Sequence, residues 1–222
     1  MQFRPVNTCV AVAIALVALF GAGCVSLIQG NVSENHQSGA APGTGVIVGS
    51  VTAPEVWYHD DAYFYYRSIG DGGKHKGVLT SGTMFPFLSP WLPSCDEGGL
   101  ADQCGRLFAI SLPAGSYEIH TARLERHYFE LKQPAVFTVT EGSAIYLGNL
   151  HVAYCKGMPG RTRGNILGAD ISIRDEYERD TGLIRERFGS LHETIIDRQL
   201  LPDYAWRYRV SFTPYDWGTC SR

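Results

Sequence analysis

The chain has 222 residues, a formal net charge of -3 at pH 7 and 45% hydrophobic residues. Phosphate contacts need a basic surface, so this charge balance argues against a nucleic-acid partner. The length suggests one domain with an appended segment, and it is sufficient to bury a sizeable core. Short apolar runs and many Gly, Tyr and Phe residues favour β-structure over helices.

Residues 1–23 are expected to be a cleaved export signal. Arg4 precedes an uncharged apolar run over residues 9–20. A membrane span needs about 20 apolar residues, whereas the apolar core of an export signal needs about 7–15. Three small residues follow the run at 21–23, as a signal peptidase requires. For these reasons we favour the signal over the alternative of a buried core helix.

The end of this segment, Ala22-Gly23-Cys24, resembles the lipobox of bacterial lipoproteins. In that family the signal is cut before the cysteine, which carries a diacylglycerol thioether and an amide-linked acyl chain. The resemblance therefore implies cleavage after Gly23 and a membrane anchor on Cys24, although Gly21 stands where the family usually has leucine. Simple secretion is the alternative. The family's sorting rule reads the next residue; Val25, rather than Asp, implies the outer membrane if the source is Gram-negative.

Residues 24–44 are expected to comprise the lipidated cysteine and a flexible tether. The segment is rich in Ser, Asn, Gly and Gln and shows no hydrophobic periodicity. Such composition is typical of a flexible linker.

Four further cysteines indicate disulfides, because an exported protein meets an oxidising compartment. They allow three connectivities. Cys95 and Cys104 flank a short Gly-rich loop, so we favour that pair and, by elimination, Cys155 with Cys220. The spacings lack a C-x2-C pair, which argues against a zinc site.

Residues 45–222 are expected to form one β-rich domain. Alternating apolar and polar residues predict strands. A hairpin is predicted around Glu141-Gly142. The expected strands cover residues 45–51, 62–68, 107–112, 116–120, 135–139, 144–152, 169–175 and about 205–213.

One helix is predicted over about residues 176–189. Asp175 and Glu178 form a capping-box-like pair at its start, and Gly189 supplies a stop. Gly182 weakens the helix by about 1 kcal/mol relative to Ala. One amphipathic helix with many strands suggests a β-sandwich with a packed helix. Its apolar stripe comprises Tyr177, Leu183, Ile184 and Phe188.

The runs LFAISLPAGSYEI and AVFTVTEGSAIYLGNL resemble the prealbumin-like, or transthyretin-like, sandwich. That layout places a strand, a Pro-Gly turn, a Y-x-I strand and a G-x-x-Y-L-G strand in order. It is shared by carboxypeptidase regulatory domains and by families of uncharacterised bacterial lipoproteins. The resemblance covers residues 45–153 and implies an antiparallel sandwich with no catalytic residues to carry over.

Two patterns could carry chemistry. Aromatic residues crowd positions 57–66 and can bind sugars or peptides, but they also suit half-buried strands, so we favour packing. His120, His127 and His151 could form a metal site. No H-E-x-x-H signature accompanies them, and isolated surface histidines are the favoured interpretation. No cofactor is predicted.

The segment 84–94 is apolar and broken by prolines, so it is neither a helix nor a central strand. It either caps the sandwich or, if exposed, docks a partner. We expect a lipid-anchored, non-catalytic binding or structural module that docks an envelope protein or glycan. The alternative is an envelope enzyme, a metal-assisted hydrolase using surface histidines. The docking residues would be Phe85, Phe87, Leu88, Trp91 and Leu92.

Overall fold

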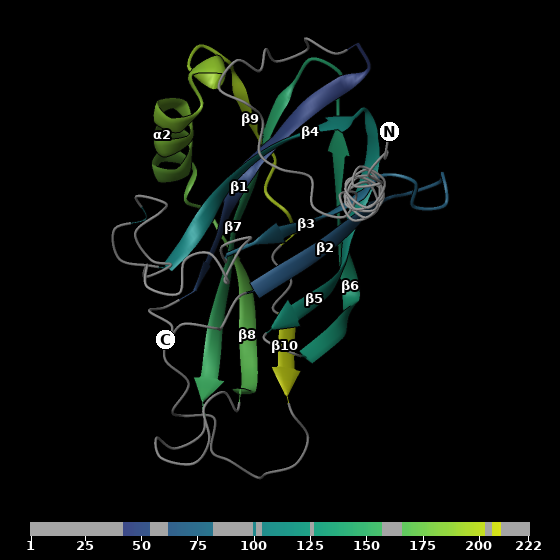
Figure 1. The fold of residues 1–222 in the computed structure, drawn as a ribbon, viewed down its shortest axis with the longest axis vertical. Coiled ribbons are helices and arrows are strands. Elements are labelled where there is room, and N and C mark those ends of the chain that lie inside the picture. The colour runs from purple at the N-terminus through teal and green to yellow at the C-terminus, as the bar shows by residue number, and fades with distance from the viewer. Residues whose placement is uncertain are drawn as a thin grey trace, which may run out of the picture.

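The structure, a computed structural model, describes residues 42–53, 62–81, 100, 104–124, 127–156, 166–202 and 206–209. Within these ranges the chain is mainly β, with two sheets and one α-helix (Figure 1). No helix among the described residues is long and apolar enough to cross a membrane. The elements are β1 (Thr44–Ala53), β2 (Ala62–Ser68), β3 (Lys76–Thr80), β4 (Cys104–Pro113), β5 (Gly115–Leu124), β6 (His127–Val139), β7 (Ala144–Lys156), β8 (Ile166–Arg174), α2 (Tyr177–Arg187), the 3-10 turn η1 (Gly189–Leu191), β9 (Ile196–Arg198) and β10 (Trp206–Arg209).

The six-stranded sheet has the order β10-β8-β7-β1-β4, with β9 also paired to β7. The four-stranded sheet has the order β3-β2-β5-β6 and is antiparallel throughout. The predicted mainly-β class with one helix is confirmed. The expected antiparallel pairing holds for most strand pairs but is wrong for β7, which runs parallel to both β1 and β9.

The predicted hairpin around Glu141-Gly142 is also wrong. The turn joins β6 of the four-stranded sheet to β7 of the six-stranded sheet, and those two strands do not pair with each other. Gly142 has a φ of 73°, which suits a tight turn. The crossing from one sheet to the other is needed because the two strands bury their apolar faces from opposite sides of one core.

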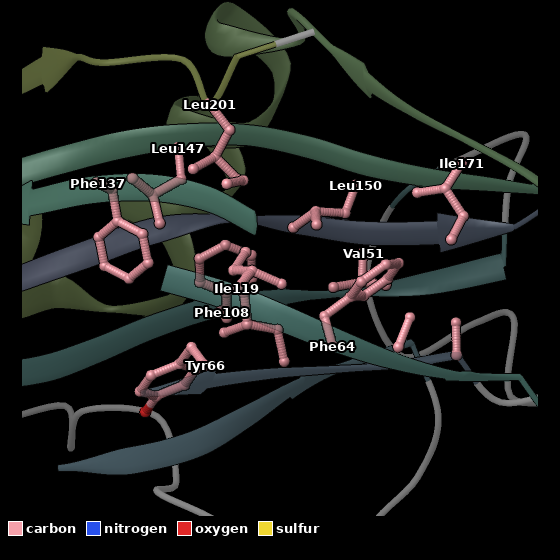
Figure 2. Packing of buried hydrophobic residues seen from close by; sticks show 14 of the residues in the cluster. Val51, Phe64, Tyr66, Phe108, Ile119, Phe137, Leu147, Leu150, Ile171 and Leu201 are labelled. Carbon is pink, nitrogen blue, oxygen red and sulfur yellow. The ribbon is translucent and has the colours of Figure 1, made fainter. Parts of the chain in front are cut away.

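The main core lies between the two sheets. Tyr117 of β5 stacks on Phe137 of β6 with ring centroids 5.4 Å apart, and it meets Tyr66 of β2 edge-on at 6.4 Å. The Trp206 side chain of β10 reaches the same core, and its Nε1 donates to the carbonyl of Gln133 at 3.1 Å. Figure 2 shows apolar side chains of both sheets meeting in this layer, among them Val51, Phe64, Phe108, Ile119, Leu147 and Leu150.

The helix α2 packs on the outer face of the six-stranded sheet, against β1, β4 and β7 (Figure 1). Ile184 and Phe188 are buried there, and Tyr177 and Leu183 are partly buried, which confirms the predicted apolar stripe. The helix covers a second, smaller apolar cluster that includes Leu100.

The predicted capping box at the start of α2 does not form. Glu176 is the N-cap residue and makes no side-chain capping bond. The carboxylate of Asp175 instead forms an ion pair with Arg198 of β9 and accepts only a long bond, 3.4 Å, from the N–H of Tyr177. A tertiary ion pair has therefore replaced the local cap.

The chain enters the domain at one end of the sandwich. The N–H of Gly43 donates to Oε1 of Glu141 at 2.7 Å, and the carbonyl of Gly43 accepts from Ala114 at 2.7 Å. Ala114 lies in the β4–β5 turn and Glu141 in the β6–β7 turn. The opposite end carries the β5–β6 connection after Leu124. The predicted tether therefore joins the domain at the end with the β4–β5 and β6–β7 turns, opposite the β5–β6 connection.

Candidate functional site

Four side chains gather on the outer face of the four-stranded sheet. In β2, alternation buries Phe64 and Tyr66 in the core and turns Tyr63 and Tyr65 outward, where both are partly exposed. Core and cross-strand packing were predicted for this aromatic cluster; Phe64 and Tyr66 pack in the core, and Tyr63 and Tyr65 contact side chains of neighbouring strands. We define the tyrosine–arginine face as Tyr63, Tyr65, Arg123 and Tyr128.

Strand register brings these residues together. Tyr63 of β2 lies opposite Arg123 of β5, and Arg123 lies opposite Tyr128 of β6. Residues directly opposite each other on one face have Cβ atoms about 4.5–5.5 Å apart, close enough for long side chains to touch. The face is thus built by three neighbouring strands.

The guanidinium of Arg123 lies at the centre of the face. Its carbon is 3.8 Å from the ring centroid of Tyr63 and 5.6 Å from that of Tyr128, both within cation–π range. Its Nη1 donates to the Tyr128 hydroxyl at 3.1 Å. The ring of Tyr65 lies 6.0 Å from that of Tyr128, at an interplanar angle of 33°. These contacts hold the rings in place before any ligand arrives.

The charge of Arg123 acts on the neighbouring phenols. The hydrogen bond from Arg123 lowers the pKa of Tyr128, and burial raises the pKa of Tyr65 to about 12. Among the described residues, no carboxylate forms an ion pair with Arg123, whereas Arg67 on the same sheet binds Glu118 at 2.7 Å. The Nε of Arg123 is buried and has no hydrogen-bond acceptor. The face therefore presents an uncompensated positive charge among aromatic rings.

Its exposure makes the face available for contact. Tyr128 has 62% of its surface exposed although it lies in a regular strand. Tyrosine and arginine are the residues that protein interfaces and their hot spots most often use. The arrangement offers a partner aromatic ring surface around one cation.

A second polar cluster lies beneath α2 and is buried. The carboxylate of Asp180 is fully buried and accepts from Ser50 Oγ at 2.6 Å and from the Tyr146 hydroxyl at 3.0 Å. Nε and Nη2 of Arg179 donate to its other oxygen at 2.9 and 2.7 Å. Both carboxylate oxygens are therefore satisfied inside the fold.

The cluster continues along the strands to His151. Asn149 Nδ2 donates to Ser50 Oγ at 2.7 Å and to Thr52 Oγ1 at 2.9 Å, and Thr52 Oγ1 lies 3.0 Å from His151 Nδ1. Burial, assisted by the charges of Arg174 and Arg179, lowers the pKa of His151 to about 4. Ser50 and Thr52 are completely buried, so their hydroxyls hold the sheet together and do not meet substrate.

The structure separates two of the three histidines proposed as a metal site. His120 lies on β5 in the four-stranded sheet, where its Nδ1 contacts Thr121 Oγ1 at 2.7 Å. His151 lies on β7 in the six-stranded sheet and is only 4% exposed, so its assignment as a surface histidine is wrong. His127 is the first residue of β6. Within the described residues, no three His, Cys, Asp or Glu side chains are grouped to hold a metal.

Several predicted residues lie outside the described ranges. These are Cys24, Cys95, Cys220 and the apolar docking segment with Phe85, Phe87, Leu88, Trp91 and Leu92. Cys104 begins β4 and Cys155 lies in β7. Lipidation, the two disulfides and the docking segment therefore remain predictions.

Comparisons with known proteins assign no family. No family model matches the chain, and no curated protein matches it. A leucine-rich repeat protein from Bacteroides thetaiotaomicron VPI-5482 is similar over 55% of this chain and 18% of its own length, with 11% identity and a TM-score of 0.27. A likeness this remote carries no argument about fold or function.

Proposed function

We propose that this protein is a lipid-anchored, non-catalytic module of the bacterial cell envelope that docks a partner through the tyrosine–arginine face. The observation that carries the proposal is the exposure of Tyr128, which is held in place by Arg123 on a regular strand. A rigid, exposed aromatic residue loses little side-chain entropy on binding, so it is an efficient contact residue.

The anchor is supported by the sequence Ala22-Gly23-Cys24 and by the tether that follows it. One acyl chain anchors a protein only marginally, but two or three chains on one cysteine hold it firmly. We extend the proposal to the prealbumin-like topology of residues 45–153. Its support is the two-sheet architecture and the order of β4, the turn at Pro113-Ala114-Gly115, β5, β6 and β7.

The docking function is tested by crosslinking the full-length protein in its native envelope and identifying adducts by mass spectrometry. We expect one partner above background. A Tyr65→Ala/Tyr128→Ala variant should lose it, while the matched control Ile195→Ala/Leu200→Ala, which removes exposed apolar side chains elsewhere, should retain it. Equal recovery from both variants would contradict docking through this face.

The anchor has its own test. A Cys24→Ala variant should lose labelling by a fatty-acid analogue and leave the membrane fraction. Continued labelling of this variant would exclude Cys24 as the acceptor.

A further inference from the structure

Arg123 has no acidic partner among the described residues, unlike three other arginines of the fold. Arg67 binds Glu118, Arg179 binds Asp180, and Arg198 binds Asp175. Arg123 binds no carboxylate among the described residues and lies against tyrosine rings instead.

Its donor capacity is also incompletely used. A guanidinium has five N–H donors in a planar fork, and this fork matches the two oxygens of a carboxylate. At Arg123, Nη1 donates to the Tyr128 hydroxyl, and the unpaired Nε is buried, so a partner from outside would meet the terminal nitrogens Nη1 and Nη2. A carboxylate is the group that suits both the charge and the remaining N–H donors of these two nitrogens.

The hydroxyl groups of the face favour a protein over a sugar. Sugar and other small-ligand sites need several polar groups that converge on the ligand. Here the Tyr128 hydroxyl already accepts a hydrogen bond from Arg123, so these two polar groups are engaged with each other. What the face offers outward is ring surface around one cation, the composition of a protein-binding hot spot.

The position of the face in the domain agrees with an external partner. Arg123 lies near the end of β5, and Tyr128 near the start of β6, beside the β5–β6 connection. The tether joins at the other end of these strands, next to Ala114 and Glu141. The ten residues of β5 separate the two ends by about 33 Å.

We infer that the partner docked by the tyrosine–arginine face is a protein that presents an Asp or Glu carboxylate to Arg123, with apolar side chains packed on the rings of Tyr65 and Tyr128. This inference rests on the proposed docking function and specifies the chemistry of the partner. Aromatic rings around the ion pair exclude water, which strengthens a charge pair at the centre of an interface.

The experiment places p-benzoylphenylalanine at Tyr128 in the full-length protein and irradiates cells that make it. A matched control carries the same photocrosslinker at Ile195, which is 81% exposed and immediately precedes β9 of the six-stranded sheet. We expect a protein adduct from position 128 that position 195 does not give. The crosslinked partner peptide, identified by mass spectrometry, should contain an Asp or Glu.

Substitution of Arg123 in the crosslinking protein tests the charge directly. Arg123→Glu should reduce the adduct at least about tenfold, whereas Arg123→Lys, which keeps the charge but not the fork, should reduce it less. Protease resistance of each variant, compared with that of the parent, reports whether the fold is intact. Arg123→Gln supplies a neutral variant if Arg123→Glu does not fold.

The outcomes separate the inference from the function on which it rests. An adduct that survives loss of the positive charge, or a contact peptide without an acidic residue, would overturn the inference and leave docking intact. An adduct with glycan, lipid or a second copy of this chain would overturn the inference that the partner is a different protein. No adduct specific to position 128 would overturn the docking function itself.

Discussion

At the scale of single residues, His151 makes folding sensitive to acid. Its ring is buried beside Thr52, and burial lowers its pKa to about 4 from the ordinary value of 6.5. The unfolded chain therefore binds a proton between pH 6.5 and 4 that the folded chain does not. Stability is fully present above pH 6.5 and falls as the pH drops through this window, by about 3 kcal/mol at pH 4.

The test compares free energies of unfolding at pH 7 and pH 4.5 in denaturant titrations. The difference between the two pH values should be smaller in His151→Gln than in the parent, because glutamine does not titrate. His192→Gln is the control, since His192 is exposed. An unchanged pH dependence in His151→Gln would show that this ring does not carry the effect.

The residue scale also shows where sequence reasoning fell short. The sequence shows tyrosines at positions 63, 65 and 66, and strand alternation indicates that Tyr63 and Tyr65 share one face. Their partners Arg123 and Tyr128 are distant in sequence and meet them only through strand register. A period-2 pattern predicts which side of the sheet a residue lies on, but not which residue lies beside it on the next strand. The position of Arg123 at the centre of the tyrosine–arginine face could therefore not be predicted.

At the scale of elements, two glycines should respond in opposite ways to alanine. Gly182 lies in the middle of α2, is exposed, and has no atom within 4 Å of an added Cβ. Gly148 in β7 has a φ of +108°, and an added Cβ would lie 2.8 Å from Ile173 Cγ2. Helix propensity therefore favours alanine at the first position, and backbone strain with a steric clash disfavours it at the second.

We expect Gly182→Ala to stabilise the protein by about 0.5–1 kcal/mol. Gly148→Ala should destabilise it by more than that, because both the backbone and Ile173 must shift. Urea denaturation of the full chain in detergent measures both changes. Destabilisation by Gly182→Ala would mean that α2 is distorted at this position.

Most elements were predictable, but β3 and β9 were not, and β6 begins eight residues before the strand predicted at 135. The assembly of the elements was not predictable either. Alternation located most of the strands, and the 3.6-residue period located α2. The helical pattern did not predict the burial of Asp180 and Thr181. A polar residue is expected to be exposed unless its buried hydrogen-bond partners, such as Ser50 for Asp180, are known. Local pattern likewise leaves strand direction open, so neither the parallel β1–β7 pair nor the crossing at Gly142 followed from the sequence.

At the scale of the whole molecule, the proposed lipid anchor and tether predict an orientation of the domain on a membrane. About 20 residues separate Cys24 from Gly43, and a flexible chain of that length has a root-mean-square span of about 25 Å. Gly43 is bonded to the β4–β5 and β6–β7 turns. This end should therefore stay nearer the lipid than the end that carries the tyrosine–arginine face.

Lipidated protein in vesicles with nitroxide-labelled headgroups would measure this orientation. A fluorophore attached through an azide-bearing amino acid at Thr140, at the tether end, should be quenched more than one at Glu130, towards the other end of β6. The Cys24→Ala protein should show no quenching at either site, which separates a failed anchor from a failed orientation. Equal quenching of the lipidated protein would mean that the domain tumbles freely or lies flat. The tyrosine–arginine face would then have no preferred direction, and partners in the same membrane would reach it as readily as partners beyond it.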